Sequence, residues 1–328
     1  MKKPLPNSLR YNDKMMIYEQ KRNIRRINWL LFWVIVSRVV ISLTLDAVTS
    51  FMPSELAEAQ TADYLKSIII GILTIFLPVY IYFKHEMFSF LGNDIKQELN
   101  FNKFSVLQGF IICVLAVSGQ FIMQILNIPM TLLQEVWGLA DRSVAAISFW
   151  NVTLGIISVA LFPAVLEEFL LRGVVYGAYK RQSTVAAALF STVMFAILHI
   201  NIFGALGYIF LGIMLVSVMS RTGSLYAAML YHFITNLSAL TLTFTLGYLN
   251  ELEDAGGITN TNVFWLFIGA VIVFMIAMFI FRIITPNAEK NRGRNAAALF
   301  LQNLFSIPVI LCIIIAVVTQ YFIIAQRI

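Results

Sequence analysis

Residues 144–179 read VAAISFWNVTLGIISVALFPAVLEEFLLRGVVYGAY, and the charged side chains in this apolar run are Glu167, Glu168 and Arg172. A helix needs about 20 mostly apolar residues to cross the hydrocarbon core of a membrane. The run is longer than that, so it predicts a spanning helix that is tilted, extends beyond the bilayer or is broken. Pro163 lies within the run and removes an intrahelical hydrogen bond, which favours a kink just before the charged residues.

The composition of the whole chain agrees with a membrane environment. Of the 328 residues, 59% are hydrophobic and 12% are charged, whereas an average soluble domain is roughly 45–50% apolar and about 25% charged. A chain with so few charges cannot cover a surface that faces water, so the composition excludes a soluble globular domain and a disordered chain. Cys113 and Cys312 lie in apolar runs, without the spacing of a disulfide framework or a metal motif.

Eight or nine segments are long and apolar enough to cross a bilayer. Lipid offers the backbone no hydrogen-bond partners, and a helix satisfies its own, so each segment is expected to be helical. The sequence therefore predicts an all-α fold, a polytopic transmembrane helix bundle with eight or nine spans. The expected spans are residues 27–50, 64–83, 104–126, 144–179, 184–201, 203–220, 224–248, 263–284 and 303–325.

The charged residues between the spans predict their orientation. Residues 1–26 form a basic tail, whereas the stretch from Asp46 to Asp63 carries four acids and no Lys or Arg. Basic and acidic segments continue to alternate, and basic segments face the cytoplasm. We therefore expect a cytoplasmic N-terminus. The expected regions are a basic tail at 1–26, N-terminal spans at 27–143, a functional core at 144–250 and two C-terminal spans at 251–328.

Ionisable side chains inside the spans are candidates for a functional site, because a charge within the membrane is costly. They are Arg38, Glu167, Glu168, Arg172, His199 and His232. Glu168 and Arg172 are one helical turn apart and can pair, while Glu167 is turned away by about 100°. One carboxylate can thus be neutralised while the other faces a cavity as a general base. Three environments stay open for Arg38: an ion pair with Asp46, the lipid headgroups, or the bundle interior.

Two further motifs place imidazole and amide groups on helix faces. Phe195 and His199 are one turn apart on the fifth expected span, as are His232 and Asn236 on the seventh. A histidine and an asparagine on one face suit either an oxyanion or a metal ion. Counted at about 1.5 Å per residue from the basic ends of their spans, Glu167, His199 and His232 lie at similar depth. We therefore expect these three side chains to meet in one cavity.

Three motifs occur in order on successive helices: Glu167-Glu168-x-x-x-Arg172, Phe195-x-x-x-His199 and His232-x-x-x-Asn236. Together they resemble the CAAX protease and bacteriocin-processing enzyme family, also called the Abi or type II CAAX prenyl endopeptidase family. The resemblance covers about residues 145–250. It implies a polytopic intramembrane endopeptidase in the plasma membrane of a bacterium.

The resemblance also implies a role for each motif residue. Glu167 and His199 would activate the attacking water, and His232 and Asn236 would stabilise the oxyanion. The second glutamate and the arginine of the first motif would hold the shape of the cavity or touch the substrate. The cofactor stays open, because Glu167, His199 and His232 would either bind a divalent metal such as zinc or act without one. The zinc-protease motif H-E-x-x-H is absent from the chain.

Two other functions fit parts of the pattern. A non-proteolytic member of the same fold would serve as a bacteriocin-immunity factor or a membrane scaffold, although a scaffold does not need the costly polar cluster. A transporter would line a path open to both sides, and the chain shows no inverted repeat. The expected partners are the lipid bilayer, a membrane-associated peptide or protein substrate, and a partner membrane protein or a second copy of the chain. Nucleic acid is not an expected partner.

Overall fold

The computed structural model describes residues 7–53, 60–82, 84, 99–139, 149–252, 260–285 and 295–325. Over these residues the chain is helical, and its β-structure is limited to an isolated bridge between Phe101 and Ser224. This confirms the predicted all-α fold. The elements are α1 (Asn7–Ser50), α3 (Gln60–Gly71), η1 (Ile72–Phe76), α4 (Leu77–Tyr82), α7 (Val106–Val136), α8 (Phe149–Gly155), η3 (Ile156–Leu161), α9 (Phe162–Glu168), η4 (Phe169–Tyr176), α10 (Gly177–Tyr179), α11 (Thr184–Leu198), η5 (Ile202–Gly204), α12 (Ala205–Thr222), α13 (Leu225–Leu252), α14 (Asn260–Ile284), α15 (Ala296–Leu304) and α16 (Ile307–Ala325).

Eight helical segments in the described part of the chain are long and apolar enough to cross a membrane. The remaining expected span corresponds to α11, an apolar helix of 15 residues. At about 1.5 Å per residue, α11 is roughly 22 Å long and therefore shorter than the ~30 Å hydrocarbon core. The protein is an integral membrane helix bundle, and the cytoplasmic position of its N-terminus stays a prediction.

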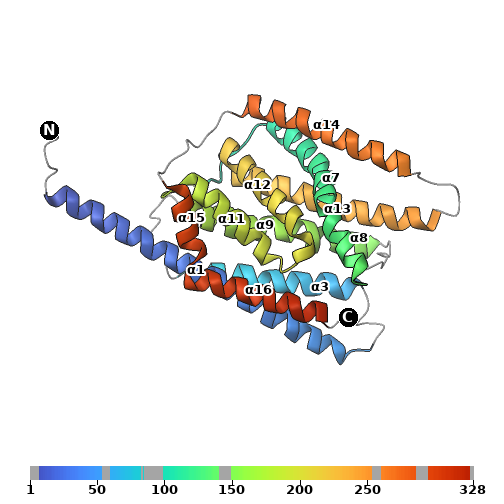
Figure 1. The fold of residues 1–328 in the computed structure, drawn as a ribbon, viewed down its shortest axis with the longest axis horizontal. Helices are drawn as coiled ribbons and strands as arrows, with labels where there is room; N and C mark the ends of the chain where they lie inside the picture. Colours follow the sequence, from blue (N-terminus) through green and yellow to red (C-terminus); the bar gives the residue numbers. More distant parts are fainter. Residues whose placement is uncertain are drawn as a thin grey trace.

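The helices that carry the charged motifs lie inside the bundle. In Figure 1, α9 and α11 lie between one group formed by α7, α13 and α14 and another formed by α1, α3 and α16. Contacts between α7 and α14, and between α1 and α16, join parts of the chain that are far apart in sequence. As a result, Glu167, Glu168 and Arg172 are buried, with relative exposures of 3%, 0% and 0%.

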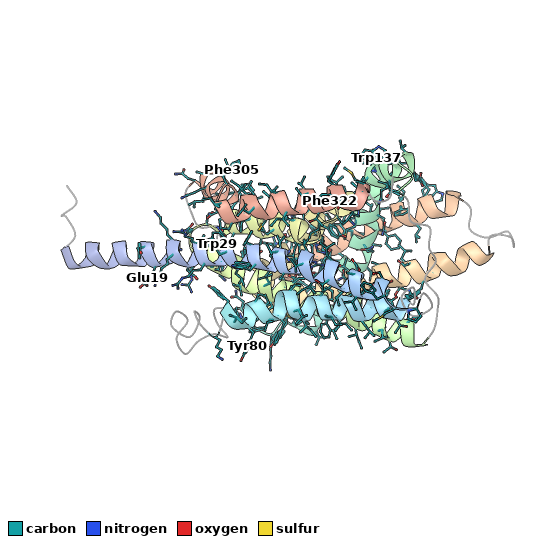
Figure 2. The ribbon with its side chains drawn as sticks, turned by 90° about the horizontal axis from the view of Figure 1, so that it is seen from below. Glu19, Trp29, Tyr80, Trp137, Phe305 and Phe322 are labelled. Carbon is teal, nitrogen blue, oxygen red and sulfur yellow. The ribbon has the colours of Figure 1, made fainter. Side chains whose placement is uncertain are left out.

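The outer surface of the bundle carries many large apolar side chains. Figure 2 shows Tyr80, Trp137, Phe305 and Phe322 at this surface, and Phe305 and Phe322 are 66% and 58% exposed. Soluble monomers rarely expose contiguous apolar patches of this kind. In a membrane the same side chains contact lipid, which agrees with the hydropathy of the helices.

The fourth expected span is helical but is not a continuous α-helix. The short α9 is preceded by the π-helical η3 and followed by the π-helical η4. Pro163 lies at the start of α9, directly after η3, where it removes one backbone N–H donor. The kink predicted near Pro163 stays a prediction, and the π-helical turns on either side of α9 were not predicted. Such turns are rare and frequent at functional sites, and here η4 carries Arg172.

The helices α11 and α12 form a closely packed hairpin. A Cβ atom on Gly212 would lie 2.9 Å from Cγ2 and 3.2 Å from Cα of Thr192, so a glycine is what allows this approach. Between the helices, the side chain of Asn201 accepts hydrogen bonds from two backbone N–H groups. The connection starts at Ile200, whose φ of 48° lies in the left-handed region that β-branched residues rarely adopt. This sharp turn comes directly after His199.

Candidate active site

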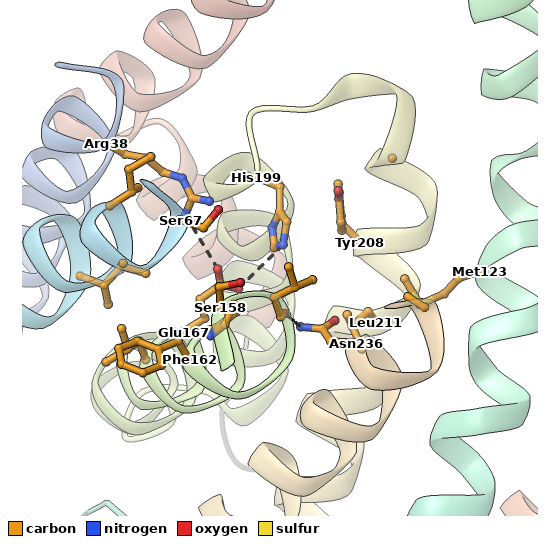
Figure 3. A pocket seen from close by; sticks show the side chains of 18 of the residues that line it. Arg38, Ser67, Met123, Ser158, Phe162, Glu167, His199, Tyr208, Leu211 and Asn236 are labelled. Atoms are coloured by element: carbon orange, nitrogen blue, oxygen red, sulfur yellow. Dashed lines mark hydrogen bonds and ion pairs between the residues drawn. The ribbon is translucent and has the colours of Figure 1, made fainter. Parts of the chain in front are cut away.

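A cavity of about 540 Å³ lies between α1, α3, α7, α9, α12 and α13. Of the predicted site residues, Glu167, His199 and Asn236 line it. Figure 3 shows these three side chains together with Arg38 and Tyr208. The other predicted site residues, Glu168, Arg172 and His232, are not part of the lining and lie behind the cavity wall. The predicted residues therefore form two layers, one at the cavity and one buried.

Glu167 lies between two groups that can carry positive charge. Its Oε1 atom is 3.8 Å from Nη1 of Arg38 on α1, and its Oε2 atom is 3.8 Å from Nε2 of His199. Both distances are too long for direct hydrogen bonds. Oε2 is buried and has no hydrogen-bond partner within the described residues. The carboxylate thus keeps acceptor positions available on the side that faces His199.

His199 follows the last residue of α11 and is oriented by two contacts. Its Nδ1 atom lies 2.8 Å from the carbonyl oxygen of Phe195. A carbonyl only accepts, so Nδ1 carries the proton and Nε2 of the neutral ring is an acceptor facing Glu167. The ring also stacks on Tyr208 of α12, with centroids 4.0 Å apart and an interplanar angle of 26°. Because α11 ends here, at the turn that starts with Ile200, the ring reaches the cavity from the end of the helix.

The buried layer is an ion cluster centred on Glu168. Its Oε1 atom accepts hydrogen bonds from Nη1 of Arg172 at 2.8 Å and from Nδ1 of His232 at 2.9 Å. Arg172 also donates through Nη2 to the carbonyl of Gly212 at 3.2 Å, and its guanidinium lies 4.7 Å from the centre of the Phe195 ring. The predicted pairing of Glu168 with Arg172 is confirmed. The cluster ties α13 and the α11–α12 hairpin to the helical segment that carries Glu167.

Asn236 lies one turn after His232 on α13 and has a different partner. Its Nδ2 atom donates to the carbonyl of Val159 at 3.1 Å. An amide nitrogen carries two N–H groups, so one of them stays available for a group in the cavity. Of the two residues expected to point at a common position, Asn236 lines the cavity and His232 binds Glu168 instead.

The side chains do not fit a metal site with three protein ligands. One of the two open alternatives was a metal ion bound by Glu167, His199 and His232. His232 is 1% exposed and uses Nδ1 to bind Glu168, whereas the other two meet at the cavity. Over the residues that the structure describes, no group of three or more His, Cys, Asp or Glu side chains could hold a metal ion. The chemistry derived below therefore uses the groups of the chain itself.

The structure adds residues that the sequence motifs did not identify. Arg38 faces the bundle interior, one of its three open environments, while Asp46 lies 3.7 Å from Lys66. Gln120 on α7 lines the cavity, is 4% exposed, and its Oε1 atom lacks a partner among the described residues. A polar side chain within an apolar span was a usable signal for Gln120. Tyr208 gave no such signal, because an aromatic residue in an apolar helix is usually part of the packing.

Comparison with known proteins supports a protease family for this site. No curated protein and no solved structure matches the chain. A family model does match, described as type II CAAX prenyl endopeptidase Rce1-like, and it covers residues 149–238. The matched segment contains every residue of the three motifs, whereas Arg38 and Gln120 lie outside it. The family indicates a membrane-embedded protease of the CAAX type in general. Residues 149–238 thus match the Rce1-like family of type II CAAX prenyl endopeptidases, in agreement with the resemblance that the three motifs indicated.

Proposed function

We propose that the protein is an intramembrane endopeptidase that hydrolyses a peptide bond of a membrane-associated peptide or protein. The observation that carries the proposal is the arrangement of Glu167 and His199 at the cavity. Their facing atoms, Oε2 and Nε2, lie 3.8 Å apart, and both are acceptors when the His199 ring is neutral. A polar contact longer than about 3.5 Å leaves the possibility of a bridging water.

A water molecule between Glu167 and His199 would donate one hydrogen to Oε2 and the other to Nε2. Its lone pairs would then face the cavity, where a peptide carbonyl can approach. Glu167 acts as the general base: it takes a proton as the water oxygen bonds to the carbonyl carbon. It returns that proton to the leaving amine when the C–N bond breaks. The carboxylate of Glu167 is thereby restored, and the products are an amine and a carboxylic acid, which then loses its remaining proton to water.

The tetrahedral intermediate carries a negative charge on the former carbonyl oxygen. Asn236 has one N–H group bound to Val159 and a second available in the cavity. We assign this second N–H as a donor to the oxyanion, a kind of interaction that lowers the barrier because it strengthens as charge develops. The water, the carbonyl carbon and the amide donor would then meet in a cavity inside a helix bundle, where fixed protein groups replace much of the bulk solvent.

We assign positioning roles to Glu168, Arg172 and His232. All three are buried, and their hydrogen bonds connect three helical segments that carry the groups at the cavity. Glu168 follows Glu167 directly, so the hydrogen bonds of Glu168 hold the stretch of backbone from which the Glu167 side chain extends. The cluster thus acts through the orientation of Glu167 and not through contact with the substrate.

Substitution of Glu167 and His199 tests the proposal. We expect Glu167→Gln and His199→Ala to abolish cleavage while the protein still inserts and elutes as the wild type does in detergent. Quantitative proteomics of membranes from cells with wild-type protein or Glu167→Gln would identify a substrate fragment that depends on the carboxylate. Glu135→Gln is the matched control, because Glu135 is exposed at the end of α7 and outside the cavity. Undiminished turnover by purified Glu167→Gln would rule out the assigned role.

A further inference from the structure

Arg38, Ser42 and Ser67 are among the residues that line the cavity, and Arg38 and Ser42 are one helical turn apart on the same helix. Figure 3 shows Arg38 and Ser67 on one side of Glu167, with Tyr208 and Asn236 on the other. Arg38 and Ser42 belong to α1 and Ser67 to α3. These helices lie outside the segment that matches the family model, so this part of the cavity lining is built by parts of the chain to which that family match assigns nothing.

Most of the hydrogen-bonding capacity of Arg38 is unused. Its one polar contact within the described residues is the 3.8 Å ion pair with Glu167, which is too long for a hydrogen bond. A guanidinium has five N–H donors in a planar fork. The side chain is 27% exposed, so the remaining donors can be reached from the cavity. An arginine held at this depth in a membrane protein calls for a ligand or a function.

The cavity holds no other permanent cation among its described lining residues, and Glu167 is its one acid. The two serines add hydroxyl groups that make no hydrogen bond within the described part of the chain. A planar fork with flanking hydroxyls matches the geometry of a carboxylate, which an arginine binds through two parallel hydrogen bonds. A doubly charged phosphate would meet only this single positive charge, which Glu167 already partly neutralises.

We propose that Arg38, with Ser42 and Ser67, binds a carboxylate of the peptide substrate. This inference rests on the proposed function, since it concerns the substrate of the same site. In a peptide, the carboxylate comes either from the chain terminus or from an Asp or Glu side chain. Nη1 of the guanidinium lies 3.8 Å from Glu167, and the other N–H groups would bind the ligand, so that Arg38 attracts both carboxylates and lies between them.

Three matched libraries of apolar synthetic peptides test the subsite and separate its two sources. The first library ends in a free carboxylate, the second ends in an amide, and the third is amidated and contains one Asp at varied positions. Cleavage in detergent is followed by mass spectrometry for wild type and for Arg38→Gln. We expect the wild type to prefer one carboxylate library over the plain amide by about tenfold, as charge-assisted pairing implies. Arg38→Gln should reduce that preference to about twofold or less.

Two variants separate carboxylate binding by Arg38 from an effect of Arg38 on the position of the Glu167 side chain. Arg38→Lys keeps the charge but loses the fork, so it should retain part of the preference. Lys66→Gln removes a cation from α3 that does not line the cavity and pairs with Asp46 and Asp63. This control should leave the preference unchanged. A merely structural Arg38 would slow cleavage of all libraries equally, and that result would overturn the subsite.

Binding measured without turnover keeps the two proposals distinguishable. Fluorescence anisotropy of the labelled carboxylate and amide peptides is compared for Glu167→Gln and for the double variant Glu167→Gln, Arg38→Gln. Tighter binding of the carboxylate peptide that disappears in the double variant supports the subsite. Equal affinities for both peptides contradict it, whatever the cleavage assay shows. Cleavage that persists in Glu167→Gln contradicts the proposed mechanism alone.

Discussion

Glu168 accepts a hydrogen bond from Arg172 at 2.8 Å, and both side chains are completely buried. The pair lies one helical turn apart on the segment that also carries Glu167. Breaking a buried ion pair leaves an uncompensated charge, which typically costs about 3–5 kcal/mol. The pair is therefore a structural requirement for the cavity that it adjoins.

Replacing Arg172 should destabilise the fold strongly. Arg172→Met leaves Glu168 with His232 as its remaining partner, and we expect a loss of about 3–5 kcal/mol in the free energy of unfolding. Thermal or denaturant unfolding in detergent, followed by tryptophan fluorescence, measures this. Adding Glu168→Gln should recover part of the loss, since it removes the orphaned charge. Arg221→Met is the control, because that partly exposed side chain donates to a single carbonyl. An equal loss in both arginine variants would contradict the role of the cluster.

Asn236→Ala should lower kcat much more than it changes KM. The amide is assigned to the oxyanion, and removal of one such donor typically costs about 10²–10³ in rate. Single-turnover and steady-state kinetics with one cleaved peptide separate the two constants. Ser238→Ala on the same helix is the control, since the Ser238 hydroxyl bonds only to the carbonyl of Ile234 among the described residues. A large rise in KM with unchanged kcat would indicate substrate binding in place of oxyanion stabilisation.

Tyr208 should support activity through its ring. The ring stacks on His199, and an aromatic contact of this kind contributes about 0.5–1.5 kcal/mol. We therefore expect Tyr208→Leu to lower kcat/KM by roughly twofold to tenfold, while Tyr208→Phe, which keeps the ring, stays close to wild type. Initial rates of peptide cleavage by the wild type, Tyr208→Leu and Tyr208→Phe measure these changes in kcat/KM. A loss in Tyr208→Phe as large as in Tyr208→Leu would assign the effect to the hydroxyl.

Gly212→Ala should push the hairpin helices apart. The new Cβ would lie 2.9 Å from Cγ2 of Thr192, close to backbone as well. Overpacking of this kind typically costs about 1–3 kcal/mol, and it also moves the carbonyl that Arg172 binds. Unfolding in detergent measures the loss, and Thr192→Ser should restore part of it. Gly269→Ala is the control, because nothing lies within 4 Å of the added Cβ. Equal stability of both alanine variants would contradict the close approach.

The sequence predicted those features that depend on local periodicity or on hydrophobicity. The apolar runs had to be helices, since lipid cannot bind the backbone, and the structure has them. The pairing of Glu168 with Arg172 followed from the spacing of a helical turn and is confirmed. Both predictions depend only on the local sequence and on whether water or lipid surrounds the helix.

Contacts between helices could not be predicted in the same way. The sequence gives the face on which Arg38 or His232 lies but not the rotation of that helix against its neighbours. Arg38 therefore had three open environments, and Glu168 was not expected as the partner of His232. Ile200 shows a second limit, because a positive φ at a β-branched residue opposes local preference and is imposed by tertiary packing. That residue sets where His199 leaves its helix.

The shortness of α11 also has a consequence for biogenesis. A translocon that selects segments by length and hydrophobicity would insert a helix of 15 residues into the bilayer inefficiently if that helix were presented alone. Its successor α12 follows after a turn of a few residues and packs against it along its length. We expect the two to enter the bilayer together as a preformed unit, so that a defect in α12 would also leave His199 outside the lipid phase during synthesis.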